Sequence, residues 1–144
     1  MSVGRSTVAV MDILEINRKV IEQFRAGGEI DGMHRERLLL LTTKGARTGT
    51  DRTSPMMFHP DGDRVVVMAS NAGAPKAPDW YANLRANPTV TVERGDEAYT
   101  AVARELNGDE RSRLWADITA ANPFFLDHEK KANRQIPLVA LMRE

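Results

Sequence analysis

The chain has 144 residues, 42% of them hydrophobic and 28% charged, which is ordinary for a single globular domain. Its 20 Lys and Arg residues balance 20 Asp and Glu residues, which argues against a dedicated nucleic-acid binder. The lack of cysteine excludes disulfides, thiol nucleophiles and cysteine-ligated metals. We see neither a membrane-spanning apolar run nor a signal peptide, so we expect a cytoplasmic protein.

The first predicted element is an amphipathic helix that follows a flexible leader at residues 1–10. Asp12 is a candidate N-cap, Glu15 completes a capping box, and Gly27 and Gly28 end the helix. Its apolar stripe, typical of a helix packed on a core, consists of Ile13, Ile16, Val20, Ile21 and Phe24. Basic side chains flank this stripe, so peripheral association with a membrane stays an alternative.

The rest of the chain reads as short strands joined by turns, with interspersed helices. Apolar or alternating runs predict strands at 38–43, 52–59, 64–70, 89–93, 97–105 and 136–142. Helices are predicted at 79–86 and 109–121, with a short helical piece ending near 132. Most strands follow one another through tight turns, so we expect an α+β fold: a small antiparallel barrel with helices over its openings.

The turn after the first strand is a candidate anion site. Lys44, Arg47 and Arg52 surround Gly45 and Gly49, whose backbone N–H groups can approach an anion closely. Threonine hydroxyls in the same turn add further donors. A solvated hairpin turn would explain the same charges, and no P-loop sequence follows. Spacing alone therefore leaves both interpretations open.

A second candidate segment lies between the third strand and the next helix. Ser70 opens a loop of small residues that also contains Lys76. The helix then begins at Asp79, whose carboxylate opposes the usual preference of helix N-termini for anions. Trp80 and Asn83 lie one turn apart and can face one cleft, although a tryptophan at such a place is more often part of the core.

The histidines give no metal or nucleophile signal. His34, His59 and His128 are far apart and share no metal-ligand spacing. The chain also lacks a Gly-x-Ser-x-Gly elbow. We therefore predict no metal site.

Several motifs together resemble one family. They are Leu-Leu-Thr-Thr-x-Gly-x-Arg-Thr-Gly-x-x-Arg at 40–52, Val-Met-Ala-Ser at 67–70, Pro-x-Trp-Tyr-x-Asn-Leu-x-Ala-Asn-Pro at 78–88, and Ile-Pro at 136–137. This pattern is similar to that of the deazaflavin-dependent nitroreductases, which are split β-barrel, FMN-binding-like proteins that use coenzyme F-420. The resemblance covers the chain from about Leu38 to its end.

The resemblance implies a site for F-420, whose phosphate and oligoglutamate tail are anionic. The basic turn would hold the phosphate end, 54–57 and 68–70 would flank the ring and ribityl chain, and the helix at 79–86 would close the site. Carried over residue by residue, the cofactor-binding positions are Ala46, Arg47, Thr48, Arg52, Ser54, Pro55, Met56, Met57, Met68, Ala69, Ser70, Asn71, Trp80 and Asn83.

The chain departs from the family at positions that bear on cofactor and substrate. Ala46 stands where family members often carry a basic residue, and Asn71 where they can carry lysine, which keeps FMN as the alternative cofactor. The expected substrate contacts are Met57, Phe125 and His128, where nitro-reducing members have aromatic or tyrosine side chains. His128 is a candidate proton donor, but no single indispensable acid or base is expected.

The implied activity is hydride transfer from reduced F-420 to a flat, electron-poor substrate. Quinones, ring-conjugated enones or lactones, and nitroaromatics all meet this description, and oriented stacking would do much of the work. A non-catalytic carrier of F-420 or of a lipid is the alternative from a different class. The protein is expected to act as a monomer or a homodimer.

Overall fold

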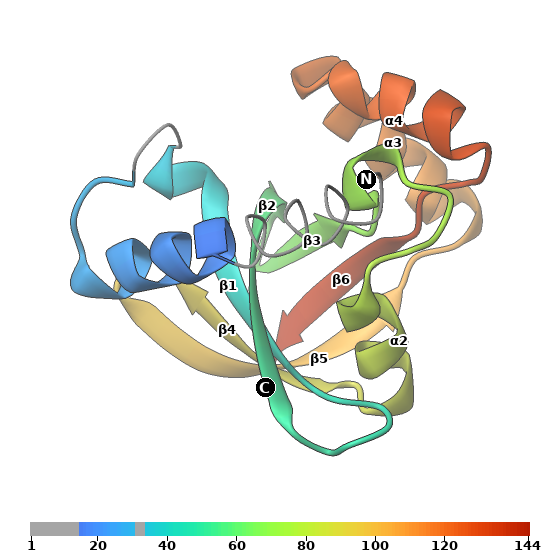
Figure 1. Ribbon diagram of the computed structural model, residues 1–144. Coiled ribbons are helices and arrows are strands. Elements are labelled where there is room, and N and C mark those ends of the chain that lie inside the picture. The colour runs from blue at the N-terminus through green and yellow to red at the C-terminus, as the bar shows by residue number, and fades with distance from the viewer. Residues whose placement is uncertain (1–14, 31–33) are drawn as a thin grey trace, which may run out of the picture.

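A computed structural model of the protein describes residues 15–30 and 34–144 (Figure 1). Its strands are β1 (Leu38–Lys44), β2 (Asp51–Asp61), β3 (Arg64–Met68), β4 (Thr89–Arg94), β5 (Glu97–Glu105) and β6 (Leu138–Arg143). All neighbouring pairs are antiparallel, and they close a barrel in the order β1-β2-β3-β6-β5-β4. The predicted α+β fold with an antiparallel barrel is confirmed.

Helices cover the barrel at several places. They are a helical segment at 15–26, the short turns η1 (Arg35–Arg37) and η2 (Asn71–Gly73), and α2 (Asp79–Ala86), α3 (Gly108–Ala121) and α4 (Phe124–Ala132). The first helix ends at Gly27, as predicted, in a left-handed conformation with φ 81°. The leader at 1–10, Ile13 and the predicted cap at Asp12 lie outside the described residues. No helix in the described ranges combines the length and apolar character that crossing a bilayer requires.

Two predicted boundaries differ from the structure for local reasons. β3 ends at Met68 rather than residue 70, because the chain bends at Ser70 into η2. β6 begins at Leu138 rather than residue 136, since Pro137 has no N–H to donate to a neighbouring strand.

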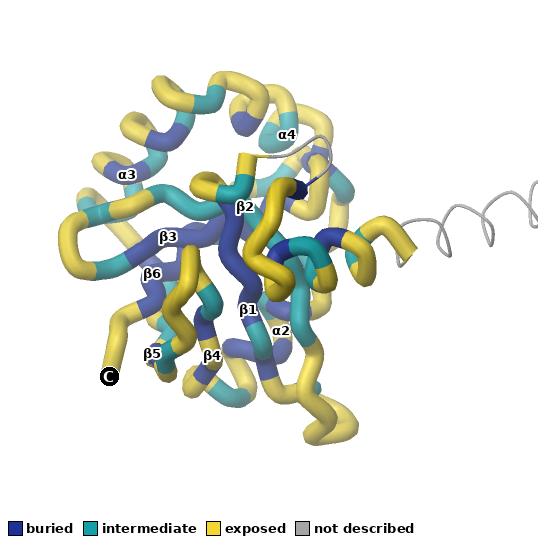
Figure 2. Tube along the Cα trace, turned by 90° about the vertical axis from the view of Figure 1, so that its left-hand side faces the viewer, coloured by how far each residue is buried: buried dark blue, intermediate teal, exposed yellow. Residues whose placement is uncertain are grey.

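Strand β1 is continuously apolar because both of its faces are covered. Leu39 and Leu41 lie in the barrel interior with valines of β3, β4 and β6. Leu38 and Leu40 pack on the outer face under the helix at 15–26. Figure 2 shows β1 as a buried strand with this helix beside it. A third cluster fixes α3 and α4 against the outer faces of β3 and β6.

Arginines fix the first helix to the barrel. Arg25 donates two hydrogen bonds to the Glu93 carboxylate, at 3.1 and 2.9 Å. Arg35 donates to the Phe24 carbonyl at 2.6 Å and to the Gly95 carbonyl at 3.1 Å, with its guanidinium 4.3 Å from the centre of the Phe24 ring. Such bidentate and stacked contacts suit arginine better than lysine. The helix is therefore a part of the domain.

The barrel splits along strand β2. Its first part pairs with β1, from Asp51 opposite Lys44 to Met57 opposite Leu38. Pairing with β3 begins only at Phe58, opposite Val67. Residues 51–57 therefore lack a described strand partner on one edge. Pro55 lies in this part of β2, which agrees with the prediction that a proline without an N–H donor belongs at a strand edge.

Truncating Phe24 should measure how firmly the first helix is docked. Phe24 is 2% exposed, so Phe24→Ala should lower the free energy of unfolding by about 3–5 kcal/mol in chemical denaturation. Ile16 is 53% exposed on the same helix, and Ile16→Ala should change stability by no more than about 0.5 kcal/mol. Equal effects of the two variants would contradict the docked helix.

Candidate functional site

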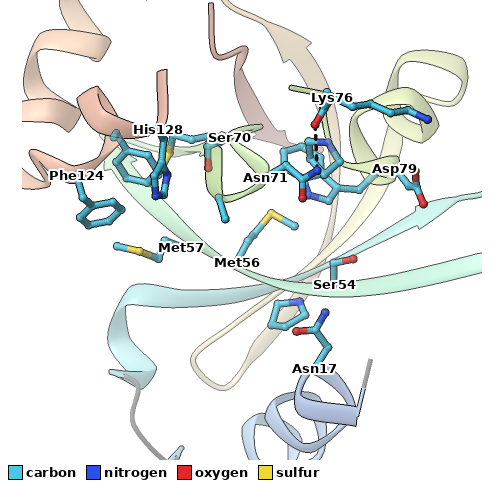
Figure 3. A pocket seen from close by; sticks show the side chains of 17 residues that line it. Asn17, Ser54, Met56, Met57, Ser70, Asn71, Lys76, Asp79, Phe124 and His128 are labelled. Carbon is cyan, nitrogen blue, oxygen red and sulfur yellow. Dashed lines mark hydrogen bonds between the residues drawn. The ribbon is translucent and has the colours of Figure 1, made fainter. Parts of the chain in front are cut away.

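A cavity of about 540 Å³ lies at the split of the barrel, beside the unpaired edge of β2 (Figure 3). This volume is within the range of roughly 300–1,000 Å³ that is typical of small-molecule sites. Its lining combines one residue of the first helix, a stretch of β2, the β3–α2 connection and the start of α4: Asn17, Ser54, Pro55, Met56, Met57, Met68, Ser70, Asn71, Ala72, Lys76, Ala77, Pro78, Asp79, Trp80, Phe124, Phe125 and His128.

Methionines of β2 and aromatic residues of α4 form an apolar part of the cavity wall. Met56 packs against the barrel core, and Met57 touches both outer clusters. In Figure 3 Met57 lies near Phe124, at the end of the cavity that α4 forms. Thioether side chains adapt to the shape of what they contact, which suits a flat ring system. Trp80 is mostly a core residue, since only 9% of it is exposed.

One polar atom in this wall lacks a partner. His128 Nδ1 is buried and makes no hydrogen bond to the described part of the chain. The His128 ring stands edge-on to Phe124 and Phe125, with ring centres 5.4 and 5.6 Å apart. A buried polar atom without a partner is costly, which makes His128 a candidate functional residue. His128 lines the cavity.

The basic turn lies outside the lining of the cavity. Its shape is set by bonds from Gly45 N–H to the Thr50 carbonyl at 2.8 Å and from Gly49 N–H to the Gly45 carbonyl at 2.9 Å. A Cβ at Gly45 would lie 2.8 Å from Thr48 Oγ1 and 3.1 Å from the Thr50 carbonyl oxygen, so a larger residue would have to displace the turn. The exposed side chains of Lys44, Arg47 and Arg52 make no ion pair or hydrogen bond to any described residue.

Asn83 connects this turn to the cavity. Its Oδ1 accepts from the Ala46 N–H at 3.0 Å, and its Nδ2 donates to Thr43 Oγ1 at 3.2 Å. Trp80, three residues earlier on α2, lines the cavity. Helix geometry separates the two positions by roughly 5 Å along the axis. Helix α2 therefore holds the basic turn at a fixed place next to the cavity.

The other side of α2 is held by Tyr81, whose hydroxyl donates to Glu105 of β5. Burial raises the pKa of Tyr81, and the hydrogen bond to Glu105 adds to this effect. Tyr81 therefore stays a neutral donor, and α2 is fixed to β5 as well as to the turn.

The structure divides the predicted cofactor and substrate residues into three groups. Ten of them line the cavity: Ser54, Pro55, Met56, Met57, Met68, Ser70, Asn71, Trp80, Phe125 and His128. Ala46, Arg47, Thr48 and Arg52 belong to the neighbouring turn and the start of β2. Ala69 and Asn83 are buried and absent from the lining.

Sequence patterns missed some of the lining residues. Asn17 lies on a helix without a distinctive motif, so nothing local indicates its place. The place of Phe124 could have been inferred from the sequence, since it is the neighbour of the predicted Phe125. Among the described residues, no group of His, Asp and Glu is arranged to hold a metal ion.

Fold and cavity place the protein among the split-barrel cofactor-binding proteins. The haem-storage protein HutZ of Vibrio cholerae shares the fold, with a TM-score of 0.57 at 18% identity over 86% of this chain and 87% of HutZ. The family model described as F-420H(2)-dependent quinone reductase matches residues 16–143. The chain therefore belongs to the F-420H(2)-dependent quinone reductase family.

Individual relatives agree with this assignment. An F-420H(2)-dependent quinone reductase of Mycobacterium tuberculosis is 34% identical over 108 residues, 73% of this chain and 72% of the relative. The solved F-420-H2 dependent reductase FDR-A has a TM-score of 0.68 at 37% identity, covering 76% of this chain and 99% of its own. A structure described as a domain-swapped dimer has a TM-score of 0.70 at 36% identity, covering 86% and 95%. The predicted F-420-dependent reductase class and cofactor are confirmed.

Replacing Asn83 should uncouple the basic turn from α2. Asn83→Leu removes both hydrogen bonds and should lower the free energy of unfolding by about 1–3 kcal/mol, since it leaves buried polar partners unsatisfied. It should also weaken binding of oxidised F-420, measured by its fluorescence. Ala82→Ser, on an exposed position of the same helix, serves as the control. Wild-type affinity and stability in Asn83→Leu would refute this role.

Proposed function

We propose that the cavity holds the ring of F-420, that the basic turn holds its anionic tail, and that the enzyme reduces quinones. The observation that carries this proposal is the adjacency of a cavity with an apolar part of its wall and a turn whose three cationic side chains pair with no described residue, in a chain of this family. A cofactor with a flat ring and a charged tail needs both features.

The charges of the chain fit the tail. Lys44, Arg47 and Arg52 have no described carboxylate partner, so a phosphate can pair with them without breaking an internal ion pair. Asn71 stands where family members can carry lysine, and its amide donates to the Lys76 carbonyl at 3.0 Å. This bond fixes the backbone at Lys76, a lining residue whose ammonium extends away from the other lining side chains in Figure 3.

Bound reduced F-420 supplies a hydride to its substrate. The protein would orient the two rings between the β2 methionines and the aromatic residues of α4. Pro78 and Trp80 would exclude water from one side of the cavity. The methionine and aromatic surfaces favour a quinone over a nitro compound, which would need more hydrogen-bond donors.

His128 is the proposed proton donor. Reducing a quinone to a hydroquinone consumes one hydride and one proton. As the imidazolium, His128 can give a proton to a substrate oxygen in the cavity that it lines and recover a proton from solvent. Phe124 and Phe125 would hold the imidazole ring in place for this transfer.

A homodimer is the proposed assembly. The support is the relative described as a domain-swapped dimer, at 36% identity. Light scattering after size-exclusion chromatography tests it, since a single monomeric species at micromolar concentration would reject the dimer.

Cofactor choice is the first test of the whole proposal. Oxidised F-420 and FMN are each titrated with the protein, following cofactor fluorescence, and then added in competition. Selective F-420 binding, followed by quinone-dependent oxidation of reduced F-420, supports the proposal. Selective FMN binding would replace the cofactor, and F-420 binding without turnover would favour a carrier.

Removing the tail cations should weaken F-420 binding. Arg47→Ala and Arg52→Ala should each cost about 1–3 kcal/mol, or roughly 5- to 150-fold in Kd, if they make charge-assisted hydrogen bonds. The effect should shrink at high salt, because both residues are exposed. Arg113→Ala, at an exposed position on α3, is the control and should leave Kd unchanged. Wild-type affinity in both turn variants would reject this placement of the tail.

Replacing His128 should lower kcat without changing the affinity for F-420. His128→Ala should reduce kcat for a quinone by up to about 10²-fold, the low end for general acid catalysis, because solvent can supply the proton more slowly. His59→Ala changes a histidine of β2 outside the cavity and should keep the wild-type kcat. A normal kcat in His128→Ala would remove His128 from the mechanism.

A further inference from the structure

Arg134 lies outside the cavity but organises one of its walls. Its guanidinium donates to the carbonyls of Ala69 at 3.3 Å, Ser70 at 3.2 Å, Ala74 at 3.3 Å and Lys76 at 3.4 Å. All four belong to the connection between β3 and α2, at least 58 positions away in sequence. No described carboxylate pairs with this half-buried arginine. Its charge is thus satisfied by backbone carbonyls alone.

The segment that Arg134 holds has an unusual backbone. Ser70 is right-handed helical, with φ −79° and ψ −32°. Asn71 and Ala72 follow with φ 50° and 53°, in the left-handed region that non-glycine residues avoid. Such strain persists only where the surroundings enforce it, and it concentrates at functional sites. The hydrogen bonds of the Arg134 guanidinium hold the segment in this conformation.

The same conformation leaves backbone donors for a ligand. The N–H groups of Ser70, Asn71 and Ala72 have no acceptor among the described residues, and all three residues line the cavity. A right-handed residue followed by a left-handed one forms a concave set of N–H groups that binds electronegative atoms. Arg134 occupies the carbonyls of Ala69, Ser70, Ala74 and Lys76, whereas the N–H groups of Ser70, Asn71 and Ala72 bond to no described residue.

Helix α4 supports the segment from the other side. Gly73 has φ 83°, and a Cβ there would lie 3.3 Å from both Cα and the carbonyl oxygen of His128. His128 and the Ser70–Ala72 segment line the same cavity. Both sets of groups can therefore serve one bound ring system.

We propose that Arg134 is a positioning residue, which keeps the Ser70–Ala72 N–H groups presented to an oxygen of a ring bound in the cavity. This inference rests on the proposed function. The oxygen can belong to the deazaflavin ring or to the quinone, since both carry ring carbonyls. Lysine at position 134 would keep the charge but lose the planar fork that reaches several carbonyls.

The test compares Arg134→Lys with wild type in three measurements: the Kd of oxidised F-420 by fluorescence, the KM of menadione with reduced F-420, and Tm. We expect Kd or KM to rise at least about tenfold, as for the loss of one hydrogen bond to a ligand. A rise in Kd assigns the oxygen to the cofactor, and a rise in KM alone assigns it to the quinone. Arg35→Lys is the control, because Arg35 also donates to backbone carbonyls, those of Phe24 at 2.6 Å and Gly95 at 3.1 Å, away from this segment. It should lower Tm and leave both binding constants unchanged.

A second substitution separates positioning from simple stabilisation. Glycine adopts left-handed φ readily, so Ala72→Gly relieves part of the strain that Arg134 enforces. Added to Arg134→Lys, it should recover part of the lost affinity. Unchanged Kd and KM in folded Arg134→Lys would overturn the inference, as would a loss that Ala72→Gly does not reduce. If wild type binds no F-420, the proposed function fails instead. Amide exchange at residues 70–74, faster in Arg134→Lys than in wild type, still tests the positioning role, and equal exchange would reject it.

Discussion

The switch of partners along β2 is the constraint on which the site depends. A strand that pairs with β1 up to Met57 and with β3 only from Phe58 leaves one edge without a ladder. Closing that edge with a further strand would remove the cavity. Instead, the β3–α2 connection and α4 face it across open space (Figure 3). The binding site is therefore a gap that the barrel topology creates, and the surrounding elements only shape it.

The elements themselves follow from local sequence. Helix α2 begins at Asp79 and ends at Ala86, and β5 spans Glu97–Glu105, both as predicted, because Pro88 and Gly95 separate them from their neighbours. The continuous apolar run of β1 was predicted as a buried strand, and burial on both faces explains it. Most of the fold was predictable because turns and periodicity are properties of short segments.

The site was predictable only where it coincides with a motif. The motifs indicated the β2 stretch, Ser70 and Trp80, which do line the cavity. They could not indicate that Asn83 bonds Ala46 and Thr43 rather than facing the cavity, since its partners are about forty positions away in sequence. The role of Arg134 could not be predicted for the same reason, because no local spacing shows that its partners are carbonyls near Ser70.

The two halves of the site use different physics, and this separates their roles. The basic turn offers exposed cations, so its attraction for an anion is long-ranged and weakened by salt. The cavity offers methionine and aromatic surfaces beside polar groups, whose hydrogen bonds depend on direction. Helix α2 joins the two halves, because its Trp80 lines the cavity and its Asn83 accepts a hydrogen bond from Ala46 in the basic turn. Affinity can then come mainly from the tail, while the placement of the reacting ring is left to a segment that Arg134 and α4 hold still.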